Sequence, residues 1–128
     1  MYLMNQRTSL TEFVLESLKS ANLMGADSTV ILTGSASVEC ARDSPNYKRF
    51  FSGQSDIDVL IVVYKDISFL RDIFSKNIMK SFIDDEINVL NHSYHYGKER
   101  NAINIKYIKQ ETFKEWTSLR RIHFKSYR

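Results

Sequence analysis

Apolar positions recur at helical spacing near the start of the chain, and the period then changes to that of a strand. Ser9 and Glu12 have the spacing of a capping box, which predicts the first turn of an amphipathic helix. Asn22 and Gly25 are suitable residues for the end of this helix, and the β-branched run 29–33 that follows predicts a short buried strand. The apolar residues that define the helical face are Leu10, Phe13, Val14 and Leu18.

The middle of the chain contains the strongest strand pattern. Residues 57–64 are continuously apolar after Asp58, which is typical of a central strand covered on both faces. Asp66 or Ser68 can then cap a second helix. The predicted buried positions of this helix are Phe69, Leu70, Ile73, Phe74, Ile78, Phe82 and Ile83.

The last part of the chain returns to strands before a final helix. Residues 87–96 and 102–108 predict two strands joined across residues 97–99. The final helix is expected to begin near Thr112, and its inward-facing residues are Phe113, Trp116 and Leu119. This order of elements predicts an α/β or α+β fold, in which flanking helices pack against a small mixed β-sheet.

Length and composition are those of one globular domain. The 128 residues are 43% hydrophobic and 26% charged, so residues 1–128 are expected to form a single domain, either entire or without a C-terminal helical domain. The longest apolar run is too short to cross a bilayer, so no membrane association is expected. Cys40 is the only cysteine, which favours a reducing, cytoplasmic setting.

The net charge of +3 is unevenly distributed along the chain. A basic cluster lies near the end of the chain. It either binds an anion such as a polyphosphate or a nucleic acid, or it is the solvated face of the final helix. Its members are Lys114, Arg120, Arg121, Lys125 and Arg128, with His123 among them.

Two acidic residues stand at the head of the central strand. Asp56 and Asp58 are two positions apart, so the period of a strand directs both carboxylates to the same face. Mg²⁺ prefers oxygen ligands and usually shares them with substrate phosphates. The pair therefore predicts a magnesium site.

A second short motif complements the aspartates. Gly34 and Ser35 directly follow the first predicted strand. The glycine permits a sharp turn and a close approach of the backbone to a ligand, and the serine hydroxyl and nearby amides are donors for phosphate oxygens. Either motif alone is unspecific, but together they indicate a site for a metal–nucleotide complex.

An apolar strand that ends in Gly34-Ser35, followed by Asp56-Ile57-Asp58 at the head of another, resembles the signature of the DNA polymerase β-like nucleotidyltransferase superfamily. The resemblance covers roughly residues 10 to 108 and implies the nucleotidyltransferase fold. It implies that Gly34 and Ser35 bind the phosphates of a nucleoside triphosphate and that Asp56 and Asp58 ligate catalytic Mg²⁺, or Mn²⁺. The implied reaction moves a nucleoside monophosphate to an acceptor and releases pyrophosphate.

The chain departs from this family pattern in two places. The stretch 36–55 between the motifs is longer than in compact members, and its loop 43–54 either carries Arg42, Lys48 and Arg49 toward the substrate or is a plain surface loop. Many members also have a third carboxylate on a later strand, where Asn104 stands here. An amide cannot act as a general base or neutralise metal charge. The alternative acids at 84–86 are more simply a solvated turn.

Two functions follow from these residues. The first is a Mg-dependent nucleotidyltransferase whose acceptor is a protein, a small molecule or RNA, with family relatives that include antitoxin-type enzymes that modify a partner toxin. The second is a catalytically degenerate module of the same fold that binds a nucleotide or a protein partner. A zinc site at His92 and His95 is not favoured, because strand spacing directs the two side chains to opposite faces.

Overall fold

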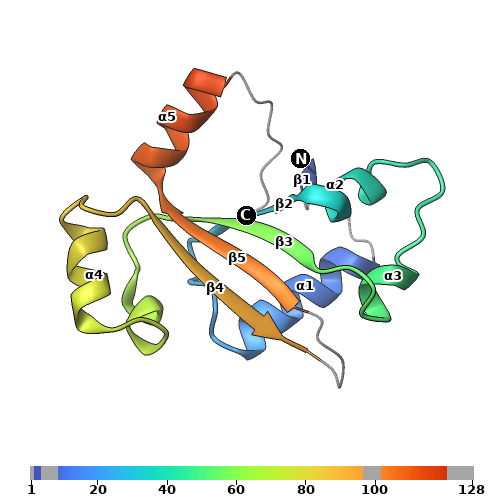
Figure 1. Cartoon of the computed structure of the whole chain (residues 1–128), viewed down its shortest axis with the longest axis horizontal. Helices are drawn as coiled ribbons and strands as arrows, with labels where there is room; N and C mark the ends of the chain where they lie inside the picture. Colours follow the sequence, from blue (N-terminus) through green and yellow to red (C-terminus); the bar gives the residue numbers. More distant parts are fainter. Residues whose placement is uncertain (1, 4–8, 97–101, 121–128) are drawn as a thin grey trace.

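A computed structural model describes residues 2–3, 9–96 and 102–120 of the chain. The helices are interspersed with the strands along the chain, as Figure 1 shows. The elements are β1 (Tyr2–Leu3), α1 (Ser9–Ser20), β2 (Thr29–Thr33), α2 (Gly34–Cys40), α3 (Lys48–Phe51), β3 (Ile57–Val63), a 3₁₀ helix η1 (Ser68–Asp72), α4 (Lys76–Ile83), β4 (Val89–His95), β5 (Ala102–Lys109) and α5 (Gln110–Arg120).

Within the described residues the strands form one sheet in the order β1-β2-β3-β5-β4. β3 and β5 are parallel, whereas the other neighbouring strands pair in antiparallel fashion. The prediction of a mixed sheet with flanking helices is therefore confirmed. β3 lies at the centre of the sheet, as its continuous apolar run predicts.

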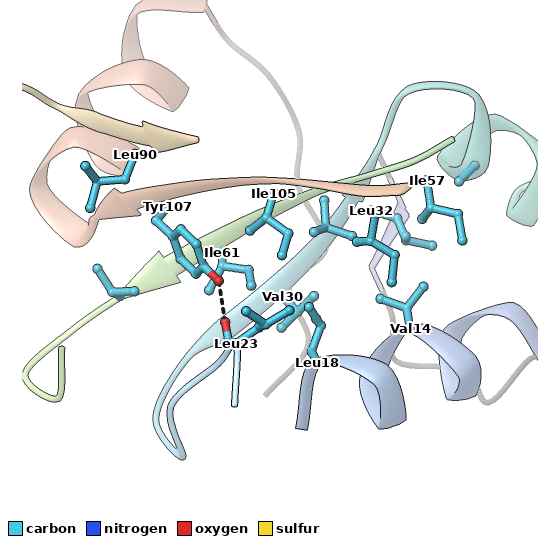
Figure 2. Close-up of a cluster of buried hydrophobic side chains, with 14 of the residues drawn as sticks. Val14, Leu18, Leu23, Val30, Leu32, Ile57, Ile61, Leu90, Ile105 and Tyr107 are labelled. Carbon is cyan, nitrogen blue, oxygen red and sulfur yellow. Dashed lines mark hydrogen bonds between the residues drawn. The ribbon is translucent and has the colours of Figure 1, made fainter. Parts of the chain in front are cut away.

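The two faces of the sheet bury cores of different size. On one face Val59 and Ile61 of β3 lie in a large core with α1, η1 and α4. On the other face Leu60 and Val62 lie in a small core, against which Phe113 of α5 packs. Figure 2 shows the large core, in which side chains of α1 meet those of the sheet. Because the small core covers only part of its face, the ends of the strands on that face stay accessible.

The predicted second helix is wrong as a single element. The structure divides it into η1 and α4, because the Ser75 hydroxyl accepts a hydrogen bond from the Ile78 amide and caps a new helix. The predicted buried positions Ile78 and Ile83 are 41% and 48% exposed. The break changes the rotation of the later turns, so that α4 buries Met79, which was not predicted, together with Phe82, which was.

The predicted loop 43–54 is also partly wrong, since it contains the helical turn α3. Phe50 of this turn is fully buried in the large core, which fixes the segment to the rest of the fold. α2 begins at Gly34 itself, directly after β2. α5 likewise begins at Gln110, directly after β5, rather than near Thr112.

Other predictions on the last helix have mixed outcomes. Phe113 and Trp116 are half-buried against the small core, as predicted. The side chains of Leu119 and Arg120 and residues 121–128, which include most of the basic cluster, lie outside the described residues. Across the described ranges, no helix is both long and apolar enough to cross a membrane.

Candidate metal and nucleotide site

The two sequence motifs meet because β2 and β3 are antiparallel neighbours. Thr33, the last residue of β2, pairs with Asp58, so Gly34 turns away from the sheet beside that aspartate. Gly34 has a φ of +63°, a conformation that residues with a Cβ rarely adopt. A Cβ atom on Gly34 would lie 2.7 Å from Asp58 Oδ2. Both the conformation and the space at this position therefore require glycine.

Asn104 lies beside the two aspartates. It pairs with Asp58 across the parallel strands β3 and β5. Its Nδ2 amide donates hydrogen bonds to Asp56 Oδ2 at 3.3 Å and to Asp58 Oδ1 at 3.4 Å. One nitrogen therefore contacts both carboxylates, which shows that the two side chains converge on one point. The structure therefore brings Asp56, Asp58 and Asn104 together beside Gly34.

Two further groups position this cluster, and sequence reasoning missed both. The backbone amide of Ala102 donates to Asp56 Oδ1 at 3.0 Å, which holds Asp56 although it lies outside the strand. Ser93 of β4 pairs with Asn104 and donates its hydroxyl to Asn104 Oδ1 at 2.8 Å. Strand alternation places Ser93 on the outer face of β4, but the pairing of β4 with β5 is not readable from the sequence.

The rest of the site is open to solvent. Ser35 is exposed in the first turn of α2, and Asp56 is exposed while Asp58 is half-buried. Lys106 is exposed two positions after Asn104, and strand alternation places it on the same face. The accessible face thus presents the carboxylates of Asp56 and Asp58, the Asn104 amide, the Ser93 hydroxyl and the Lys106 ammonium group.

The oxygen donors of Asp56 and Asp58 fit a magnesium ion. Mg²⁺ is commonly held in proteins by one or two carboxylates, with substrate phosphates and water as its remaining ligands. The convergence of both carboxylates on one hydrogen-bond donor marks a point where a positive charge is favourable. Among the described residues, no group of three or more His, Cys, Asp or Glu side chains could hold a metal ion.

The other candidates lie apart from the carboxylate pair. His92 and His95 fall on opposite faces of β4, as predicted, and His92 packs edge-on against Phe74. Partial burial lowers the pKa of His92, and the nearby His95 lowers it further. Residues 84–86 form an exposed turn at the other end of β5, where Asp85 pairs with Lys109.

Comparison of the chain with family models, with curated proteins and with solved structures finds no match. The function of the chain is therefore inferred from the two motifs and from the geometry of the cluster that they form. That cluster contains Gly34, Asp56, Asp58 and Asn104, and Ser35 follows Gly34 directly in the chain.

Proposed function

We propose that this protein is a Mg-dependent nucleotidyltransferase, which moves a nucleoside monophosphate from a nucleoside triphosphate to an acceptor. The observation that carries the proposal is the convergence of Asp56 and Asp58 on one point beside the tight turn at Gly34. A carboxylate pair next to a close backbone approach can hold a metal ion and the phosphates that share it. The resemblance of the same residues to the polymerase β-like superfamily supports this assignment.

Each residue has a separate task in the proposed reaction. Asp56 and Asp58 hold Mg²⁺, which when bound neutralises charge on the triphosphate. Ser35 and the backbone after Gly34 donate hydrogen bonds to phosphate oxygens. An acceptor oxygen forms a bond to the α-phosphorus, the bond from that phosphorus to the β-phosphate oxygen breaks, and pyrophosphate leaves.

The acceptor proton must go to a carboxylate or to water. Asn104 has no basic atom, so it orients the two aspartates but does not take the proton. Asp56 and Asp58 are the carboxylates at the point where the acceptor oxygen reacts. A reaction that proceeds without a third acid is expected to be slow relative to one that has it.

The test is label transfer together with metal-dependent binding of ATP. The chain is incubated with α-labelled nucleoside triphosphates, Mg²⁺ or Mn²⁺, and a host lysate that supplies acceptors. Asp56→Asn combined with Asp58→Asn should abolish both Mg–ATP binding and transfer. Asp72→Asn is the matched control, because Asp72 is an exposed aspartate of η1 and lies away from the pair. Absence of Mg–ATP binding in the unmodified protein would overturn the proposal.

A second candidate function is a binding module that has lost turnover. The observation that favours it is the hydrogen bonding of Asn104 to both aspartates, in the position where many relatives have an acid. Such a module would bind a nucleotide, or a protein partner as an antitoxin does. Mg–ATP binding that depends on Asp58, without transfer of label to any acceptor, would select this function over the first.

A further inference from the structure

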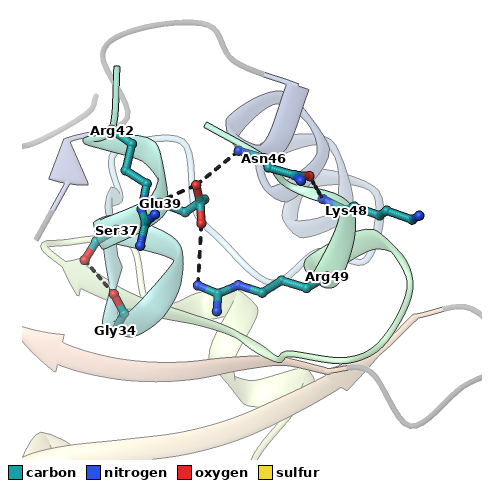
Figure 3. A network of polar contacts seen from close by, with 7 residues as sticks. All are labelled: Gly34, Ser37, Glu39, Arg42, Asn46, Lys48 and Arg49. Carbon is teal, nitrogen blue, oxygen red and sulfur yellow. Dashed lines mark hydrogen bonds and ion pairs between the residues drawn. The ribbon is translucent and has the colours of Figure 1, made fainter. Parts of the chain in front are cut away.

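The segment between the two motifs forms a polar pocket of about 440 Å³. Its walls come from the end of α2, the following loop and α3. Six of the residues that line it carry the argument: Glu39, Arg42, Asn46, Lys48, Arg49 and Gln54. Five of these side chains are drawn in Figure 3, where Arg42 and Arg49 approach Glu39 from two sides. A pocket of this volume is in the range of sites for small ligands.

The carboxylate of Glu39 contacts three other residues of the pocket. Its side chain is only 9% exposed, and its Oε2 accepts the backbone amide of Asn46 at 3.1 Å. The same carboxylate is 3.6 Å from Arg42 Nε and 3.7 Å from Arg49 Nη2. At these distances the carboxylate attracts both guanidinium groups, but it forms no hydrogen bond with either of them. The buried carboxylate therefore fixes two arginines while leaving most of their donors for a ligand.

The charge of the pocket favours an anion. Arg42, Lys48 and Arg49 contribute three positive charges, and Glu39 contributes one negative charge, which leaves a net charge of +2 on the lining side chains. Arg49 also has a buried Nε atom that has no hydrogen-bond partner in the described structure. Guanidinium groups match the geometry of phosphate oxygens, and an ammonium group adds a mobile charge. A dianionic phosphate group balances this charge and accepts hydrogen bonds from the exposed side chains of Arg42 and Lys48.

The pocket adjoins the candidate site through both motifs. Glu39 and Gly34 are on the same short helix, about 7 to 8 Å apart along its axis. Gln54 is two residues before Asp56, and the amides of Gln54 and Ser55 both donate to the Arg49 carbonyl at 3.0 Å. Short stretches of backbone therefore connect the wall of the pocket to Gly34 and to Asp56.

From this arrangement we infer that the pocket is a phosphate-binding subsite for a ligand that reacts at Asp56 and Asp58, an inference that rests on the proposed function. The phosphate belongs either to the acceptor or to the triphosphate itself. The pocket has room for more than the phosphate group, so it also contacts the part of the ligand next to it. The segment between the motifs is thus a recognition element and not a plain surface loop.

The test measures binding of inorganic phosphate by amide shifts in NMR, at constant ionic strength so that screening does not change. Saturable shifts are expected at Asn46, Lys48 and Gln54. Arg42→Gln combined with Lys48→Gln should weaken phosphate binding roughly tenfold or more, because charge-assisted hydrogen bonds are lost from two exposed side chains. Arg71→Gln combined with Lys76→Gln is the matched control, since it removes the same charges from exposed residues at another pocket.

The outcomes separate this inference from the proposed function. Absence of saturable shifts at the pocket, or equal phosphate affinity in the Arg42/Lys48 variant, overturns the subsite even if Mg–ATP binds. Asp58→Asn should lose Mg–ATP binding and keep phosphate binding. Phosphate binding without any Mg–ATP binding overturns the proposed function. The pocket would then be an anion site that takes no part in nucleotidyl transfer. If the subsite stands, displacement of phosphate by Mg–ATP assigns it to the triphosphate, whereas simultaneous binding assigns it to the acceptor.

Discussion

At the scale of single residues, Gly34 is the position least able to accept a side chain. Gly34→Ala places a methyl group 2.7 Å from Asp58 Oδ2 and forces a positive φ on a residue with a Cβ. The left-handed conformation alone should lower the free energy of unfolding by about 1–2 kcal/mol. Displacement of Asp58 should in addition weaken Mg–ATP binding roughly tenfold or more. Denaturant unfolding and calorimetric titration measure the two effects.

The two effects of the alanine can be separated with a second glycine. Gly53 also has a positive φ, of 89°, so Gly53→Ala introduces comparable backbone strain in the segment before β3. It should lower stability while leaving Mg–ATP affinity closer to that of the unmodified protein. Equal losses of affinity in both variants would show that strain, and not the contact with Asp58, controls the site.

Asn104 offers a test that does not depend on turnover. In Asn104→Asp a third carboxylate replaces an amide that donates to Asp56 and Asp58. Without metal, the lost hydrogen bonds and the new repulsion should lower the free energy of unfolding by about 1–3 kcal/mol. Mg²⁺ should restore much of this loss, because a cation now satisfies three carboxylates.

Thermal unfolding with and without Mg²⁺ measures the change at Asn104. Asn77→Asp adds the same charge at an exposed position of α4 and serves as the control. A metal-dependent rise in Tm confined to the Asn104 variant supports a metal site at the pair. Equal responses of both variants to Mg²⁺ would contradict it.

Residue types and spacing were sufficient to select the candidate site, but not to explain its geometry. Strand alternation predicts that Asp56 and Asp58 share a face, and the structure places both next to Asn104. The contact of Gly34 with Asp58 depends on the antiparallel register of β2 and β3. That register is a long-range property, which the local sequence does not contain.

At the scale of elements, four of the five described strands were predicted close to their observed ranges, whereas β1 was missed. β2 agrees with the predicted range, and β3 ends only one residue earlier than predicted. The agreement is good because runs of β-branched residues have a strong local preference for strands. The helix after β3 was predicted as one element, since Ser75 was not recognised as a cap inside a continuous apolar pattern. α3 was missed because four residues are too few for a periodic signal and Phe50 is held by the core.

Strand β4 carries a pH-dependent contribution to stability. Partial burial and the neighbouring His95 lower the pKa of His92 in the folded state, so the unfolded state binds more protons near pH 6. Stability from this group is therefore fully present above about pH 6.5 and decreases as the pH falls through that value. His92→Gln should reduce the loss of stability between about pH 7.5 and pH 5.5.

Urea unfolding at both pH values measures the slope of stability for each variant. His95→Gln removes only the repulsion on His92 and keeps its partial burial, so its slope should lie between those of the other two proteins. If all three proteins lose the same free energy on acidification, His92 does not contribute to the pH dependence.

At the scale of the whole molecule, the order of the strands in the sheet could not be predicted from the sequence. The strands β4 and β5 are neighbours in sequence and in the sheet, as a predicted hairpin requires. β5 nevertheless lies between β4 and β3, and its pairing with β3 is parallel. A parallel pair of strands needs a long crossover connection, and η1, α4 and β4 provide it. Only packing of the large core selects this order of strands.

One side chain connects the distant parts of this core. Tyr107 of β5 is fully buried, and its hydroxyl donates to the carbonyl of Leu23, after α1, at 2.6 Å (Figure 2). The ring also meets Phe69 of η1 and Phe74 edge-on, at centroid distances of 6.0 and 6.1 Å. Tyr107 therefore joins the sheet to both segments that cover its larger face.

Tyr107→Phe should lower the free energy of unfolding by about 1–3 kcal/mol near pH 7, because it leaves the buried Leu23 carbonyl without its donor. Burial raises the pKa of the Tyr107 phenol, so the unfolded state loses its proton first and the contribution of the hydroxyl decreases above about pH 10. The stability difference between the two proteins should therefore narrow as the pH rises past that value. Tyr94→Phe, at a half-buried tyrosine against the same core, is the control. Equal stabilities of the Tyr107 variant and the unmodified protein near pH 7 would mean that packing of the rings alone holds the two halves of the core together.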